Sequence, residues 1–152
     1  MIVIMNVYLV RHGAYALDMF SDRGPALSAY GREQARAVGD FFLREGFPVT
    51  QVITSTYLRA QETAACIQEQ LGCCLEPIEL MDFSPSGDET TMRSIIEGFS
   101  TEGLLVVGHM CSIGYLARAL CVDAPTVFNT CTAVVLEGAP KAWRVKRIFH
   151  AL

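Results

Sequence analysis

Short apolar runs that alternate with amphipathic segments constrain the fold of this chain more than any other feature. Val3–Val10 is nearly continuous and rich in β-branched residues, which is typical of a strand that is buried on both faces. Gln51–Thr54, Leu75–Ile78 and Leu104–Val107 are shorter runs of the same kind. Strands that alternate with helices predict an α/β fold with a largely parallel sheet.

The segments after these runs carry apolar residues at helical spacing. Ser28 is placed to cap a helix that runs to about Arg44 and ends at Gly46. Its inner face is Ala35, Val38 and Phe42. Three further helices are predicted. The first is Tyr57–Leu71, capped by Ser55 and Thr56 and ended by Gly72. The second is capped by Asp88 and has Met92, Ile95, Ile96 and Phe99 on one face, and the third contains Ile113, Leu116, Ala117 and Leu120.

The remaining segments complete a single domain. Ala14–Leu27 is polar, with a turn at Gly24-Pro25, and is predicted to be a loop. Thr130–Glu137 and Lys141–Phe149 are predicted to be two strands. Because no repeat or linker interrupts the chain, residues 1–152 are expected to form one three-layer α/β/α sandwich, with a mostly parallel sheet and an antiparallel C-terminal strand.

Composition and charge exclude several classes of function. The chain is 51% hydrophobic and carries a net charge of −4, so it has no basic footprint for nucleic acid. No segment approaches the roughly 20 apolar residues of a membrane helix. The six cysteines match no zinc spacing and no secretion signal is evident, so we expect a cytoplasmic protein with reduced, mostly buried thiols.

Chemically distinctive residues follow three of the predicted strands. Arg11 and His12 come directly after the first strand and His109 after a later one, while Arg59 lies in the first turn of the helix after another. In sheets of this kind, ligands bind beyond the carboxyl ends of the strands. The sequence therefore predicts that cationic and nucleophilic groups gather at one edge of the sheet.

These residue types suit phosphoryl transfer. A neutral imidazole is a good nucleophile, and a covalent intermediate divides one difficult displacement into two easier ones. Arginine stays ionised and binds two oxygens at once, and a helix N-terminus adds stabilisation of an anion. This scheme requires no metal and no cofactor. Simpler roles stay open: His12 as a hydrogen-bonded strand-end residue, Arg59 as a partner of Glu62 or Glu33, and Ser55 as a helix cap.

Several motifs together resemble the histidine phosphatase superfamily. They are Arg11-His12-Gly13, the stretch Ser55-Thr56-Tyr57-Leu58-Arg59-Ala60-Gln61-Glu62-Thr63-Ala64, Val107-Gly108-His109, and Leu27-Ser28 with Gly31 and Gln34-Ala35. The resemblance implies a phosphoglycerate mutase-like fold. The short chain and the loop Leu80–Asp88 resemble the bacterial phosphohistidine phosphatases of the SixA type.

The resemblance also implies the roles of individual residues. His12 is expected to be the nucleophile, with Arg11, Arg59 and His109 gripping the phosphoryl group and Ser55 and Gly13 adding phosphate contacts. Asp82 occupies the position at which larger members place a general acid, with Asp18, Asp22 and Asp88 as competing candidates. An imidazole leaving group demands less of such an acid than an alkoxide does.

The expected function is removal of the phosphoryl group from phosphohistidine in a signalling or phosphotransfer protein. The absence of a large inserted cap leaves the pocket open, which suits a side chain presented on a folded partner. Two alternatives stay open: a phosphomonoesterase acting on a sugar or nucleotide phosphate, and a non-catalytic phosphate-binding adaptor. The intact His12 argues against the adaptor, because binding alone needs no nucleophile.

Overall fold

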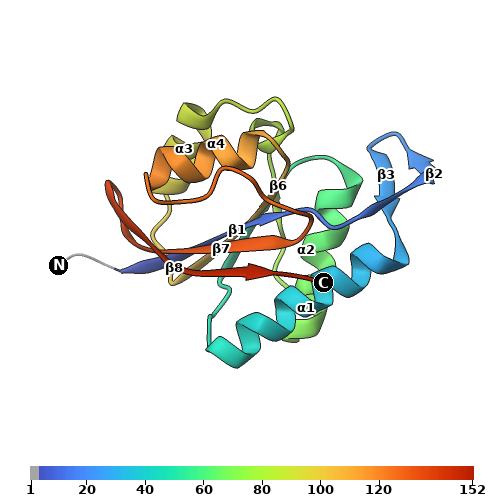
Figure 1. Cartoon of the computed structure of the whole chain (residues 1–152), viewed down its shortest axis with the longest axis horizontal. Coiled ribbons are helices and arrows are strands. Elements are labelled where there is room, and N and C mark those ends of the chain that lie inside the picture. The colour runs from blue at the N-terminus through green and yellow to red at the C-terminus, as the bar shows by residue number, and fades with distance from the viewer. Residues whose placement is uncertain (1–3) are drawn as a thin grey trace.

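The computed structural model describes residues 4–152, with the backbone alone for residues 18–20. A six-stranded sheet in the order β5-β4-β6-β1-β7-β8 forms the middle layer. Helices α1 and α2 cover one face and α3 and α4 cover the other (Figure 1). The sheet strands are β1 Met5–Arg11, β4 Gln51–Thr54, β5 Ile78–Glu79, β6 Gly103–Gly108, β7 Thr132–Ala139 and β8 Ala142–His150.

The strand directions confirm the predicted fold class. β1, β6, β4 and β5 pair in parallel, and β7 runs antiparallel to both β1 and β8. The predicted start of the first strand at Val3 lies outside the described residues. The result is a three-layer α/β/α sandwich whose parallel strands all end at one edge.

The helices begin and end largely where local sequence signals place them. They are α1 Ala29–Glu45, α2 Leu58–Leu71, α3 Glu89–Glu97 and α4 Ser112–Leu120, with a short 3-10 helix, η1, at Met81–Phe83. The Ser28 side chain accepts from the Gly31 amide and caps α1, and Asp88 caps α3 in the same way. Gly46 and Gly72 adopt the left-handed conformation that ends α1 and α2.

The alternation of side chains along β1 explains its continuous apolar run. Val7 and Leu9 lie in the core under α3 and α4, while Tyr8 and Val10 lie in the core under α1 and α2. All four are fully buried. A strand covered on both faces has no polar positions, which is why this run carries no period-two pattern.

The predicted loop Ala14–Leu27 is wrong, because this segment forms a hairpin. β2, Tyr15–Ser21, pairs antiparallel with β3, Gly24–Leu27, as a separate two-stranded sheet. The hairpin is anchored to α2: the Leu27 amide donates to Glu62 at 2.8 Å, and the Leu58 amide donates to the Arg23 carbonyl at 2.9 Å. These long-range hydrogen bonds supply stability that the local sequence does not show.

Two further predictions need correction. The third strand covers only Ile78–Glu79, because the Gln68 side chain takes both the amide and the carbonyl of Leu75 away from strand pairing. Tyr57, not Ser55 or Thr56, is the N-cap residue of α2, and its side chain makes no capping hydrogen bond.

The cysteines are free, and half of them are buried. Cys66, Cys121 and Cys131 lie in the core, Cys73 is half-buried, and Cys74 and Cys111 are exposed. The prediction of mostly buried thiols therefore holds for three of the six. Within residues 4–152, no helix is long and apolar enough to cross a membrane.

Replacement of Gly31 should loosen the packing of α1 against the loop that follows β1. A Cβ at this position would lie 1.9 Å from the Ala14 carbonyl oxygen, so the backbone must move. We expect Gly31→Ala to lower the free energy of unfolding by about 1–3 kcal/mol in urea titrations. Gly98→Ala is the matched control, because its Cβ meets nothing closer than 3.3 Å. Equal stability of the two variants would contradict this account.

Candidate active site

The pairing of β1 with β6 brings two histidines together at the carboxyl edge of the sheet. Arg11 stands opposite Gly108 in the parallel register, so His12 and His109 are the next residues on adjacent strands. Their ring centroids are 5.1 Å apart, and both side chains are almost fully buried. The predicted convergence of these two residues is therefore present in the structure.

The orientation of His12 leaves one ring nitrogen unprotonated and directed at Arg59. Its Nδ1 lies 2.8 Å from the carbonyl oxygen of Gly13. Because a carbonyl can only accept, Nδ1 carries the hydrogen, and Nε2 keeps its lone pair. The Arg59 Nε donates to this Nε2 at 3.4 Å. A neutral imidazole held in this tautomer is arranged as a nucleophile through Nε2.

Arg59 is fixed between two aromatic rings that the sequence analysis did not assign to the site. Its guanidinium carbon lies 5.1 Å from the centre of the Tyr15 ring and 4.9 Å from that of Tyr57. The Tyr57 ring also makes an edge contact with His109, with centroids 5.0 Å apart. Cation–π contacts of this kind favour a defined position for the cation. Tyr15 enters the site through the hairpin, which the sequence did not reveal.

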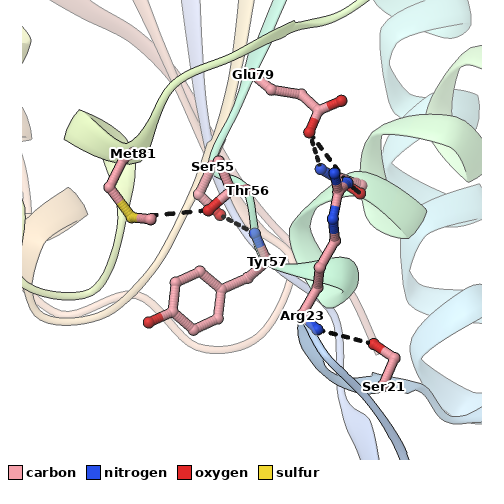
Figure 2. Close-up of polar contacts among 8 residues, drawn as sticks. Ser21, Arg23, Ser55, Thr56, Tyr57, Glu79 and Met81 are labelled. Atoms are coloured by element: carbon pink, nitrogen blue, oxygen red, sulfur yellow. Dashed lines mark hydrogen bonds and ion pairs between the residues drawn. The ribbon is translucent and has the colours of Figure 1, made fainter.

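Ser55 supports His109. The Ser55 hydroxyl lies 2.7 Å from Nε2 of His109 and accepts from the Tyr57 amide at 3.2 Å, the second contact being drawn in Figure 2. Because the hydroxyl oxygen already accepts from Tyr57, its hydrogen can go to Nε2, and His109 then carries its own hydrogen on Nδ1. That Nδ1 is buried and has no hydrogen-bond partner in the part of the chain described. A phosphoryl oxygen would supply the missing acceptor.

One nitrogen of the Arg11 guanidinium is hydrogen-bonded, and another has no hydrogen-bond partner in the described part of the chain. Its Nη1 donates to the Phe128 carbonyl at 2.9 Å, while its Nε is buried and lacks a partner among the described residues. Neither Arg11 nor Arg59 belongs to an ion pair formed by the described side chains. Two uncompensated guanidinium groups beside two neutral imidazoles make a site that favours an anion.

Burial and the neighbouring cations keep both histidines neutral. Desolvation is the main cause that lowers the pKa of His12 to about 4 and that of His109 to about 3. The charges of Arg59 and Arg11 lower both values further, and His12 adds to the effect on His109. At neutral pH both imidazoles are therefore neutral, and Nε2 of His12 carries no proton.

Thr63 joins the two halves of the site and was missed by the sequence analysis. Its hydroxyl accepts from the Gly13 amide at 2.9 Å and donates to the Arg59 carbonyl at 2.7 Å. The side chain is fully buried. The one sequence signal is the spacing of Arg59 and Thr63, which places them one turn apart on the same helix face. The Gly13 amide thus donates to Thr63, and its carbonyl accepts from Nδ1 of His12.

The acidic candidates lie in different places. Asp82 is exposed on η1, and Asp88 is occupied as the cap of α3. Asp22 lines a pocket that includes Tyr57. The side chain of Asp18 lies outside the described residues. The structure does not bring Asp82 into contact with the histidine pair through any described hydrogen bond, and its role as an acid stays a prediction.

Two other arginines are held in ion pairs. Arg23 lies 3.1 Å from Glu79, and Arg32 lies 2.9 Å from Glu62. Among residues 4–152, leaving aside the side chains of 18–20, no group of three His, Cys, Asp or Glu side chains could hold a metal ion. The site as described thus consists of two histidines and two arginines with a frame of hydroxyl groups and tyrosine rings.

Comparison with known proteins agrees with this geometry. Residues 7–83 match the Histidine phosphatase superfamily (branch 1), and the chain belongs to that family. It is therefore a phosphatase. The chain is 31% identical over 134 residues to phosphohistidine phosphatase SixA of Escherichia coli (strain K12), across 83% of this chain and 81% of that protein.

Solved structures show the same fold. The protein histidine phosphatase SixA complexed with tungstate superposes with a TM-score of 0.88 at 22% identity, covering 96% of this chain and 97% of that one. A phosphoglycerate mutase from Bacillus anthracis str. Sterne superposes with a TM-score of 0.75 at 14% identity, over 95% and 92% of the two chains. The phosphoglycerate mutase-like fold is thereby confirmed.

Removal of the Thr63 hydroxyl should both destabilise the fold and slow the chemical step. Thr63→Val leaves the Gly13 amide without its acceptor, which we expect to cost about 1–3 kcal/mol of stability. The shift of His12 relative to Arg59 should slow phosphoenzyme formation about 100-fold in rapid-quench experiments. Thr63→Ser keeps the hydroxyl and should stay within about threefold of wild type. Equal rates for the two variants would show that the hydroxyl positions nothing.

The two low pKa values predict a loss of stability in acid. Above pH 6.5 the histidines are neutral in both states, whereas below it the unfolded chain takes up protons that the folded chain rejects. Stability is thus lost as the pH falls from 6.5 toward the folded values, by about 1.4 kcal/mol per pH unit for each histidine. Urea titrations between pH 6.5 and 4.5 should show a shallower pH slope for His109→Asn than for wild type. An unchanged slope would contradict the buried neutral state of His109.

Proposed function

We propose that the protein hydrolyses phosphohistidine in a phosphorylated protein through a phosphoryl intermediate on Nε2 of His12. The observation that carries the proposal is the fixed tautomer of His12, whose unprotonated Nε2 accepts from Arg59 in a site where the buried Nε of Arg11 has no partner among the described residues. The 31% identity to phosphohistidine phosphatase SixA supports phosphohistidine as the substrate. A signalling or phosphotransfer protein as its carrier stays a prediction, as does a cytoplasmic location.

In the first step Nε2 of His12 attacks the phosphorus atom of the substrate. The phosphorus–nitrogen bond to the substrate imidazole breaks, its electron pair returns to that ring, and the ring takes up a proton from solvent or from an acid. Arg11 and Arg59 would offset the charge on the equatorial oxygens, and the Nδ1–H of His109 would donate to one of them. Ser55 would act through His109 by fixing its ring.

In the second step a water molecule attacks the phosphorus atom of the intermediate. The bond to Nε2 breaks, inorganic phosphate leaves, and His12 returns to the neutral state that its low pKa favours. Gly13 would hold the ring by accepting from Nδ1 throughout both steps. Since imidazole departs more readily than an alkoxide, the scheme makes a modest demand on Asp82 or any other acid.

Replacement of His12 tests this proposal directly. His12→Asn should lose the acid-labile phosphoryl adduct in intact-protein mass spectra after brief exposure to phosphohistidine. Its kcat/KM should fall roughly 10⁴-fold or more, because the nucleophile is lost. His150→Asn is the matched control: this third histidine is exposed on β8 and should keep the adduct. An adduct that persists in His12→Asn would overturn the proposal, and rapid turnover of a sugar or nucleotide phosphate with none of phosphohistidine would favour a metabolite phosphatase.

A further inference from the structure

A pocket of about 370 Å³ opens beside the histidine pair. Its lining comes from the tip of the β2–β3 hairpin, the residues before α2, and η1: Asp22, Arg23, Gly24, Thr56, Tyr57 and Met81. The Tyr57 ring also contacts His109 and Arg59, as described above. The pocket therefore shares a wall with the phosphate site, and Figure 2 shows most of its residues.

The pocket is a built feature of the fold. Each segment of its lining is tied to a neighbour: the Leu58 amide donates to the Arg23 carbonyl at 2.9 Å, and the Leu80 amide donates to the Thr54 carbonyl at 2.9 Å. The Thr56 hydroxyl points at the Met81 sulfur, 3.7 Å away (Figure 2). Its shape is thus set by contacts between segments far apart in the sequence.

The Arg23 guanidinium is engaged by acceptors of the protein itself and is therefore not available to a ligand. Its Nη1 donates to Gln61 at 2.9 Å and to Glu79 at 3.1 Å, and its amide donates to Ser21 at 3.1 Å (Figure 2). Arg23 and Glu79 neutralise each other, and Arg59, whose Nη1 lies beside Gly24, is already counted with the phosphate site. Asp22 belongs to no ion pair formed by the described side chains, so it is the carboxylate that remains at this pocket. The phosphate site beside it is cationic through Arg11 and Arg59. A complementary substrate therefore carries a positive group next to its phosphoryl group.

The walls of the pocket favour a long side chain with an apolar stem. The Tyr57 ring and the Met81 thioether offer apolar surface, and Met81 is 62% exposed. Lysine and arginine bury their methylene stems on such surfaces while their charged ends stay at the polar rim, here beside the exposed Asp22. The volume lies near the lower end of ligand pockets, which suits one side chain.

We propose that this pocket binds a lysine or arginine side chain that flanks the phosphohistidine of the protein substrate. The proposal rests on the proposed function and narrows its substrate class to phosphohistidine in a basic local sequence. Asp22 and Met81 thereby determine specificity, whereas the chemistry stays with His12 and its neighbours. An acidic flanking residue would meet the carboxylate of Asp22 and be disfavoured.

The test uses short peptides phosphorylated on a single histidine with phosphoramidate. Lysine, leucine or glutamate is placed at each flanking position in turn, and kcat/KM is measured beside that for free phosphohistidine. We expect lysine to exceed glutamate by about tenfold or more at one position at least, with leucine between them. In Asp22→Asn this ratio should shrink to about threefold or less, and in Asp22→Lys it should invert. Asp123→Asn, an exposed carboxylate that is not part of the pocket lining, is the control and should keep the preference.

The outcomes separate this proposal from the one on which it rests. Equal rates for all peptides, or a preference for leucine, would overturn the basic-residue pocket if His12 still became phosphorylated. Retention of the lysine preference in Asp22→Lys would overturn it as well. Failure to hydrolyse free phosphohistidine, together with no adduct on His12, would instead overturn the proposed function itself.

Discussion

The parallel pairing of β1 with β6 is the constraint on which the active site depends. It sets His12 and His109 side by side with their backbones fixed in the centre of the sheet. The His12 amide continues the ladder by donating to the Gly108 carbonyl at 3.0 Å. Neighbouring strands in a sheet lie about 4.8 Å apart. The two ring centroids, 5.1 Å apart, stay close to that spacing, so the geometry of the site follows from the geometry of the sheet.

Hydrogen bonds from side chains on α2 and at the end of β4 then fix these elements relative to the histidine pair. Thr63 ties the first turn of α2 to the loop after β1, and Ser55 ties the end of β4 to His109. Both hydroxyl groups are fully buried and fully used. Leaving either buried hydroxyl without a partner would lower the free energy of unfolding by about 1–3 kcal/mol. That loss is comparable to the loss of an apolar contact in the core. These hydrogen bonds hold the residues of the site in defined positions.

The sequence predicts the sandwich and the histidine–arginine cluster because both depend on local signals. Apolar runs mark the strands, Ser28, Asp88, Gly46 and Gly72 mark helix ends, and Arg11-His12 follows a strand end that the fold must place at the ligand edge. The hairpin could not be predicted in this way. Its hydrogen bonds to α2 join residues 35 positions apart, as with Leu27 and Glu62. Tyr15 was missed for the same reason, and so was the contact of Thr63 with Gly13, which lies 50 positions away.

The hairpin also explains how a short member of this family can control its substrate without a large cap. It brings Tyr15 against Arg59 and carries Asp22 to the rim of the neighbouring pocket. The same element therefore fixes a phosphate-binding cation on one side and presents a carboxylate on the other. Cations of the phosphate site and a carboxylate presented by one hairpin would suit a substrate that bears both signs. Under the proposed function, a substrate with phosphate alone would engage the cations but not Asp22, so this arrangement supports a protein side chain over a small phosphorylated metabolite.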